Sequence, residues 1–233
     1  MSPCQGCHSG CCRAFAIPVT GADLLRIELD LGYRFADIAC RWEDSEGQIA
    51  CGVMPHFHFA DEPQTPFAIC LKHEASQIFR RTTKCCFLVE SPPTALSPLG
   101  QSRCGIYESR PLGCRVFPTR LNTERMQAEV FEIPAHGRAS DPHPIYSLCG
   151  RPWELSDLDP VQAVQDLVLV RFELDFFTKV AAVWNRAVAE FEVFPEFLRE
   201  VYLNRVVYET RDGCSADLPA SIKGDFSRQR RAA

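Results

Sequence analysis

The sequence predicts an α+β fold in which residues 1–212 form a single domain and residues 213–233 form a flexible tail. Short apolar runs bounded by glycine and proline indicate strands in the first half of the chain. An apolar spacing of three to four residues indicates long helices in the last third, at 155–210. The chain has 233 residues, of which 46% are hydrophobic, so it can bury a core without extra cross-links.

The first helix is predicted directly after Thr20. The segment from Thr20 to Asp23 reads as a capping box, with a hydroxyl at the N-cap and a carboxylate three residues later. Gly32 is a typical C-terminal stop. The apolar face of this helix is expected to consist of Leu24, Leu25, Ile27, Leu29 and Leu31.

The middle of the chain alternates short extended runs with loops. Apolar runs at 49–53 and 67–71 are predicted to be strands. Paired prolines at Pro92 and Pro93 remove backbone donors and fix φ, so 91–100 is predicted to be a loop. A hairpin is expected from 116–121 and 126–133, joined by 122–125, and a second loop follows at 135–144.

The last third is predicted to hold two helices. The first runs from Val161 to Phe191, and the second begins with Pro195 in its first turn. We expect the apolar and aromatic stripe of each helix to pack into the core. A protein partner could bind through these helices, in which case the protein would be a structural adaptor.

Charge and the N-terminus limit the classes of function. The net charge of −5 provides no broad basic field for neutralising phosphates, so no nucleic-acid partner is predicted. The start of the chain lacks the apolar stretch of a secretory signal, and charges interrupt every long apolar run, so no membrane partner is predicted either. The expected location is the cytoplasm, where a reducing environment favours metal binding by cysteines over disulfides.

The thirteen cysteines are clustered, and this clustering indicates metal chemistry. Structural zinc takes four thiolate or imidazole ligands, and iron–sulfur clusters are held by thiolates. Eight cysteines are candidate ligands, and they could serve one metal centre or two, with zinc or an iron–sulfur cluster as the cofactor. Such ligation would make this a metal-organised domain with irregular cysteine-rich segments. The candidates lie in two regions of the chain, the first with Cys4, Cys7, Cys11 and Cys12 and the second with Cys86, Cys104, Cys114 and Cys149.

Further expectations concern the surroundings of these ligands. The adjacent Cys11 and Cys12 are expected to point to two nearby centres. Glycines after Cys104 and Cys149 could aim backbone amides at sulfur. Basic residues within two positions of candidate ligands should lower thiol pKa values; they are Arg13, Lys84, Arg103, Arg115 and Arg151.

The other cysteines and a histidine pair are interpreted as structural. Most of the remaining cysteines are expected to be core thiols, although Cys85 could replace Cys86 as a ligand. The pair His56 and His58 is expected to be structural rather than metal-binding. These remaining cysteines are Cys40, Cys51, Cys70, Cys85 and Cys214.

The cysteine pattern resembles a known bacterial family. Three stretches of the chain carry the pattern: Cys4-x2-Cys7-x3-Cys11-Cys12, then Cys86-Phe-Leu, then Cys104-Gly-Ile-Tyr-Glu-Ser-Arg-Pro-Leu-Gly-Cys114-Arg-Val-Phe-Pro. Together they resemble the YkgJ-like cysteine-cluster family, which is described as zinc- or iron-chelating. The resemblance covers roughly residues 4–150. It implies the same eight cysteines as metal ligands, with Arg110 and Pro111 in structural roles. The family also resembles flagellin lysine-N-methylases, which carry a similar cysteine set.

Together these observations predict a cysteine-ligated zinc- or iron–sulfur-binding protein whose cellular role the sequence leaves unassigned. An iron–sulfur-dependent protein lysine methylase is the alternative that the family resemblance implies. A structural adaptor with an inert metal centre is the third possibility. No catalytic residue is predicted, because the chain lacks a phosphate-binding glycine loop, a His-Glu-x-x-His helix and a serine nucleophile elbow.

Overall fold

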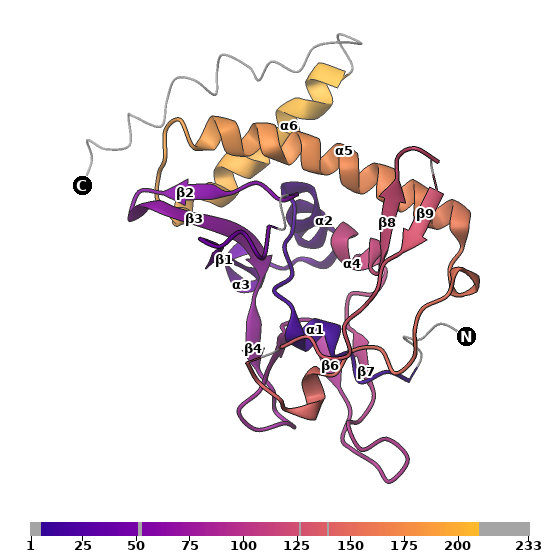
Figure 1. Ribbon diagram of the computed structural model, residues 1–233. Coiled ribbons are helices and arrows are strands. Elements are labelled where there is room, and N and C mark those ends of the chain that lie inside the picture. Colours follow the sequence, from indigo (N-terminus) through magenta and orange to yellow (C-terminus); the bar gives the residue numbers. More distant parts are fainter. Residues whose placement is uncertain (1–5, 51–52, 126, 139, 210–233) are drawn as a thin grey trace.

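The computed structural model describes residues 6–50, 53–125, 127–138 and 140–209. Within these ranges the chain forms helices and small antiparallel sheets, which confirms the α+β class. Figure 1 shows the two long helices along one side of the molecule and the smaller elements below them. The predicted tail, like Cys4, Cys51 and Cys214, lies outside the described residues.

The elements follow one another in short segments until the last third of the chain. The helices are α1 (Cys11–Ala14), α2 (Gly21–Leu31), α3 (Phe35–Ile38), α4 (Leu112–Val116), α5 (Pro160–Trp184) and α6 (Phe194–Glu209), with 3-10 turns at Pro144–Tyr146, Leu155–Asp157 and Phe191–Val193. The strands are β1 (Ala39–Glu43), β2 (Phe57–Phe59), β3 (Glu62–Leu71), β4 (His73–Ala75), β5 (Thr83–Cys85), β6 (Leu88–Glu90), β7 (Ser102–Cys104), β8 (Thr119–Asn122) and β9 (Gln127–Val130).

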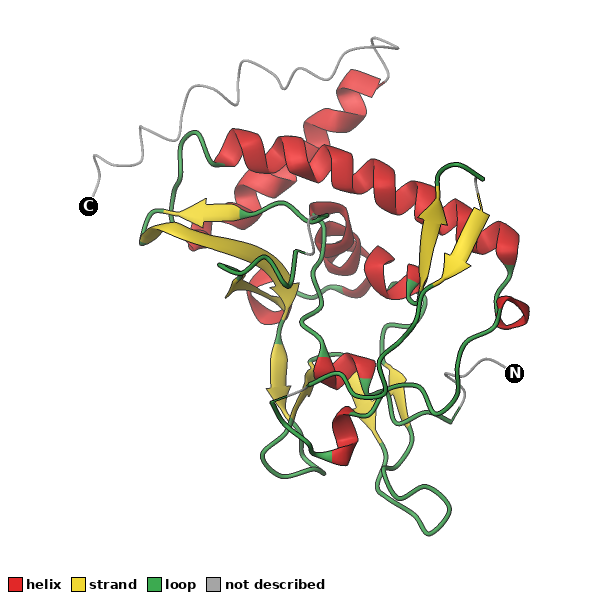
Figure 2. Cartoon of the chain, viewed as in Figure 1, coloured by secondary structure: helices red, strands yellow, loops and turns green. Residues whose placement is uncertain are grey.

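The largest sheet has the strand order β1-β3-β2, and the helices α5 and α6 lie beside it (Figure 2). Aromatic side chains join both helices to this sheet. Trp184 of α5 lies 5.7 Å from Phe59 and 4.9 Å from Phe194, measured between ring centroids. The indole N–H of Trp184 donates to the carbonyl of His58 at 2.7 Å, so its one polar group is satisfied. Edge-to-face and tilted contacts of this kind add to the burial of apolar area and hold the helices on the sheet.

The predicted start and end of α2 are confirmed. The Thr20 side chain accepts from the Asp23 N–H, the Asp23 side chain accepts from the Thr20 N–H, and Gly32 ends the helix with φ of 71°. The predicted apolar face is wrong in its second half, because only Leu24 and Ile27 are buried while Leu29 is 84% exposed. The helix therefore packs through its first two turns only.

The run at 49–53 does not form the predicted strand. Residues 48–50 form turns, and residues 51 and 52 lie outside the described part. The reason is the buried carboxylate of Asp44, which accepts from the N–H groups of Ile49 and Ala50, both at 2.8 Å, and from His56 Nε2 at 2.9 Å. Three such bonds fold the segment back onto the end of β1, whereas the run at 67–71 lies in β3 as predicted.

The predicted hairpin is present. Strands β8 and β9 pair from Thr119–Val130 to Asn122–Gln127, and the described residues of the turn between them, 123–125, fall within the predicted connection. The hairpin is shorter than expected because Val116 ends the short helix α4. Residues 91–100 have no regular structure beyond one isolated bridge, as predicted. The second predicted loop ends one residue early, because Pro144 begins a 3-10 turn, and its His136 forms an isolated bridge with Ser147.

The first long helix ends at Trp184 rather than near Phe191. Asn185 explains the end, because its side chain accepts from the His58 N–H and donates to the His56 carbonyl, tying this point to β2. The second helix has Pro195 in its first turn, as predicted. The outer face of α5 contradicts the expectation of a fully buried stripe, because Val161, Val168 and Phe172 are 67%, 45% and 55% exposed. A protein partner at these helices stays a prediction.

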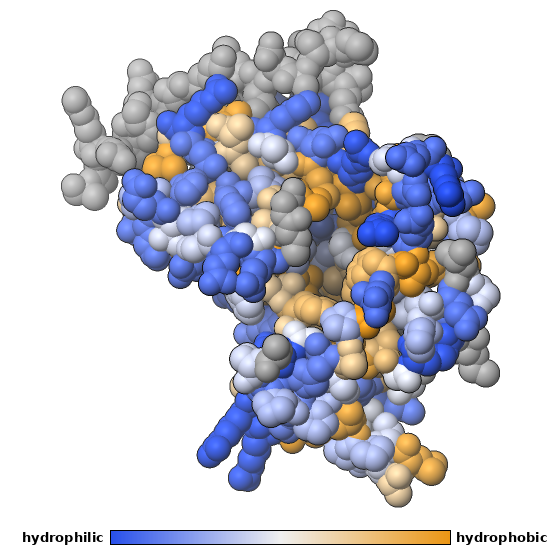
Figure 3. All heavy atoms as spheres, viewed as in Figure 1, coloured by the Kyte–Doolittle hydropathy of each residue, from blue (hydrophilic) through white to orange (hydrophobic). Residues whose placement is uncertain are grey.

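The described surface has a hollow near the middle of the face shown in Figure 3, below α5, with hydrophobic residues around it. No described helix is both long enough and apolar enough to cross a bilayer.

Candidate metal centre

Three hydrogen-bonded segments bring the cysteine-rich parts of the chain together. The Ser102 N–H of β7 donates to the Cys7 carbonyl at 2.9 Å, which joins the N-terminal segment to the β6–β7 hairpin. His8 Nε2 lies 2.8 Å from the Ser147 carbonyl, just before Cys149. Gly10 permits this approach, because a Cβ there would lie 1.8 Å from the Ser147 oxygen. Residues far apart in sequence therefore surround α1.

Asp23 fixes the fourth segment, which carries Cys114. One carboxylate oxygen accepts from the Leu112 N–H at the start of α4 at 2.9 Å and from Arg26 Nη2 at 3.0 Å. The same Arg26 nitrogen donates to the Arg110 carbonyl at 2.9 Å. Asp23, the carboxylate of the α2 capping box, thus also accepts from the first backbone N–H of α4. This bond explains how a short helix after Pro111 holds its orientation.

The charge of Cys11 raises the pKa values of three other candidate ligands, Cys104, Cys114 and Cys149. Burial, followed by the charges of Cys11 and Cys104, raises the pKa of Cys114 to about 12. Burial also raises the pKa values of Cys104 and Cys149, and in both cases Cys11 adds to the rise. Thiols can influence one another in this way only when they are close, so cysteines from the N-terminal segment, β7, α4 and the 149 loop converge around Cys11.

The convergence does not by itself form a closed coordination sphere. Among the described residues, no group of three or more cysteine, histidine or carboxylate side chains is arranged to hold one metal ion. The eighth candidate, Cys4, is not among these residues. The structure therefore brings seven of the predicted ligands into one part of the molecule but does not show their coordination.

Cys7 has a partner that the sequence analysis did not single out. Burial would raise the pKa of Cys7, but hydrogen bonds from His8 and from the Ser9 N–H, the latter at 3.3 Å, outweigh it and lower the pKa. The hydrogen bond to Cys7 raises the pKa of His8 in return. His8 and Ser9 thus favour the thiolate form of Cys7, and His8 supplies a charge partner directly after this cysteine.

Most of the cations expected to lower thiol pKa values are held in ion pairs, although Lys84 still contributes to lowering the pKa of Cys86, as expected. Arg110, by contrast, lies near the thiols and opposes the burial-driven rise at Cys104 and Cys114. Its guanidinium lies 4.1 Å from the ring centroid of Tyr107, a contact that orients it. The engaged cations form the pairs Arg13–Glu90, Lys84–Glu74, Arg115–Asp166 and Arg151–Asp157.

A backbone amide just after a glycine does reach sulfur at Cys104. The Gly105 N–H itself donates to the Phe87 carbonyl at 2.8 Å, and the hydrogen bond that favours the Cys104 thiolate comes from the backbone of the next residue, Ile106. At Cys149 the side-chain donor is instead the indole of Trp153, at 3.3 Å. The donors thus lie two residues after Cys104 and four residues after Cys149, and the geometry of each loop decides which group reaches the sulfur.

The doubled cysteine at 85–86 separates into two roles. Cys85 is buried. Its hydrogen bond to Cys86, followed by burial, raises the pKa of Cys85. The same hydrogen bond lowers the pKa of Cys86. Cys85 thus acts as the hydrogen-bond donor and Cys86 as the thiolate, which favours Cys86 as the ligand. Cys70 is buried and Cys40 half-buried, in line with their interpretation as structural thiols. His56 binds Asp44, so it too is structural.

His73 gives a prediction for the pH dependence of stability. Burial, followed by the charge of Arg138, lowers the pKa of His73 to about 4. The unfolded chain takes up this proton near its ordinary pKa of about 6.5, so the fold loses stability as pH falls from about 6.5 to about 4. His73→Phe, which keeps the ring contact with Trp42, should flatten the pH dependence of the urea unfolding midpoint between pH 7 and pH 4. An unchanged slope would contradict a buried neutral His73.

Comparison with family models, with curated proteins and with solved structures gave no match. The resemblance to the cysteine-cluster family therefore stays a prediction based on the cysteine motif.

Proposed function

We propose that this chain is a metalloprotein in which cysteine thiolates around Cys11 bind zinc or an iron–sulfur cluster. The observation that supports the proposal is the convergence of thiols from four separate segments on Cys11, with pKa values raised by burial and by one another. Clustered thiols of this kind are costly to ionise without a cation, and a bound metal supplies the positive charge that reverses this cost.

The donor set fits both candidate cofactors in its chemistry. Thiolates are the common ligands of structural zinc and of iron–sulfur clusters. The residues that would hold the metal are Cys7, Cys11, Cys86, Cys104, Cys114 and Cys149, with Cys4 and Cys12 as further candidates. His8, Trp153 and the Ile106 backbone would serve as hydrogen-bond donors to sulfur and would tune ligand basicity.

The metal would also organise the fold. Among the described residues, Arg13 joins the N-terminal segment to the β6–β7 hairpin and His8 joins it to the 149 loop, whereas Asp23 of α2 holds the start of α4. Shared ligation would fix all four segments at one point. Binding free energy would then appear as folding free energy, as in other small metal-organised domains.

The first experiment measures the metal directly. Protein purified without oxygen is assayed for zinc, iron and acid-labile sulfide, and its absorption spectrum is recorded. We expect stoichiometric zinc without sulfide, or iron with sulfide and a broad visible band. Cys7→Ser and Cys114→Ser should lose most of the metal, whereas Cys40→Ser, a half-buried cysteine outside the candidate set, should retain it. Metal-free protein with the same fold, or equal loss in all three variants, would refute the proposal.

A further inference from the structure

Two cysteines outside the candidate metal centre face each other across the main sheet. Strands β1 and β3 are antiparallel, and Cys40 pairs directly with Cys70 in their register. The Lys72 N–H donates to the Ile38 carbonyl, and the Asp44 N–H donates to the Pro66 carbonyl. In an antiparallel ladder every second pair is hydrogen-bonded, so the 40–70 pair, which lies two positions from the 38–72 pair, is also a hydrogen-bonded pair. Directly paired residues direct their side chains to the same face of a sheet.

The pairing brings the two thiols within range of each other. Cα atoms of a hydrogen-bonded antiparallel pair are about 5.5 Å apart, inside the range of about 4.4–6.8 Å found for disulfides. The Cys40 sulfur lies 3.7 Å from the Cys70 carbonyl oxygen, to which its thiol donates. Burial raises the pKa of Cys70, and the charge of the neighbouring Cys40 raises it further, as expected for two thiols that lie close together.

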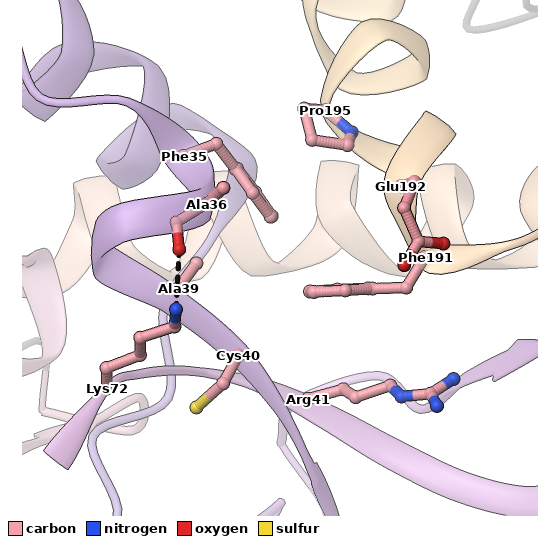
Figure 4. A pocket seen from close by; sticks show the side chains of 9 residues that line it. All are labelled: Phe35, Ala36, Ala39, Cys40, Arg41, Lys72, Phe191, Glu192 and Pro195. Atoms are coloured by element: carbon pink, nitrogen blue, oxygen red, sulfur yellow. Dashed lines mark hydrogen bonds between the residues drawn. The ribbon is translucent and has the colours of Figure 1, made fainter.

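The two thiols differ in access. Cys70 has no exposed surface, and Cys40 is half-buried. β1 is an edge strand, and Cys40 lines a cleft of about 420 Å³ between α3, β1 and the start of α6. In Figure 4 the Cys40 sulfur points away from Phe191 and Pro195. Cys40 is therefore the more accessible of the two thiols because its side chain is only half-buried, whereas Cys70 is fully buried.

We propose that Cys40 and Cys70 form a reversible cross-strand disulfide by exchange with a small-molecule disulfide that reaches the half-buried Cys40. Cys40 is the entry thiol and Cys70 the resolving thiol. Neither thiol belongs to the candidate ligand set, so the proposal goes beyond the proposed function and does not depend on it. Cys86, a candidate ligand, lies near enough for its charge to raise the pKa of Cys40.

The exchange balances as two thiol–disulfide steps. The Cys40 thiolate attacks one sulfur of the small disulfide, forming a mixed disulfide at Cys40 and releasing one small thiol, which takes up the proton that Cys40 gave up. The Cys70 thiolate then attacks the Cys40 sulfur and releases the second small thiol, which takes the Cys70 proton. Two protein thiols are oxidised to one disulfide, and one small disulfide is reduced to two thiols.

The test uses the full chain with its metal content unchanged, treated without oxygen with bis(2-hydroxyethyl) disulfide. After alkylation of free thiols and digestion without reductant, mass spectrometry should find Cys40 linked to Cys70, and a reductant should remove the link. Cys70→Ala should stop at the mixed disulfide on Cys40, because the resolving thiol is gone. Cys40→Ser should leave Cys70 unmodified.

Two controls keep the result interpretable. Cys51→Ser removes the other cysteine between these two positions and should not change the 40–70 link. Because Cys70→Ala alters a buried position, its thermal unfolding is compared with that of the untreated wild type, and Cys40→Ser tests the same link from the accessible side. A stable mixed disulfide on Cys40 in the wild type, an unmodified Cys40, or a link from Cys40 to any cysteine other than Cys70 would overturn the proposal.

Discussion

Chelation under reducing conditions is expected to lower the thermal unfolding midpoint by about 20 °C or more. The estimate follows from a metal-binding contribution on the order of 10 kcal/mol and a shift of about 2–4 °C for each kcal/mol in a chain of this size. The effect should be large because shared ligation would fix four separate segments of the chain at one point. Differential scanning calorimetry with and without a strong chelator measures it.

Matched variants separate loss of metal from loss of packing. Cys114→Ser should start with a low unfolding midpoint and respond little to the chelator, because the variant has little metal to lose. Cys40→Ser should keep the full response, since Cys40 lines the separate cleft beside β1. If the wild type and Cys40→Ser unfold at the same temperature with and without chelator, the metal does not organise the fold.

The sequence predicted best those features that depend on neighbouring residues. The capping box at Thr20–Asp23 and the glycine stop at Gly32 need only local hydrogen bonds, and both are present. The end of α5 at Trp184 depends instead on Asn185 binding the backbone of β2, more than a hundred residues earlier. Apolar periodicity continues past that point, so it could not mark the boundary.

The site shows the same division between local and distant causes. Cysteine clustering indicated which thiols belong together, and seven of the candidates do converge. The partners of nearby cations could not be predicted, because proximity in sequence placed Arg115 beside Cys114 while the fold pairs it with Asp166 of α5 at 2.5 Å. The role of His8 at Cys7 had a visible signal, since the two residues are adjacent, but a single histidine is ambiguous without its contact to Ser147.

Breaking the buried ion pair between Arg13 and Glu90 is expected to cost about 3–5 kcal/mol of unfolding free energy. The Arg13 and Glu90 side chains are 0% and 5% exposed, and Arg13 Nη2 lies 2.7 Å from a Glu90 oxygen. Arg13→Met leaves the Glu90 carboxylate buried without its cation. Because Arg13 directly follows Cys11–Cys12 and Glu90 ends β6, the same change should loosen the N-terminal segment from the hairpin and lower metal occupancy.

Urea unfolding of three variants measures this cost. Arg13→Met should be strongly destabilised, and the double variant with Glu90→Met should recover part of the loss, because no unpaired buried charge remains. Arg34→Met serves as the matched control, since it breaks a pair whose side chains are 82% and 46% exposed and should leave the urea unfolding midpoint nearly unchanged. Equal effects of Arg13→Met and Arg34→Met would contradict the expected result. A double variant no more stable than Arg13→Met would instead show that the cost comes from the hydrogen bonds of Arg13 to the His8 carbonyl and the Ser102 hydroxyl, rather than from the stranded charge.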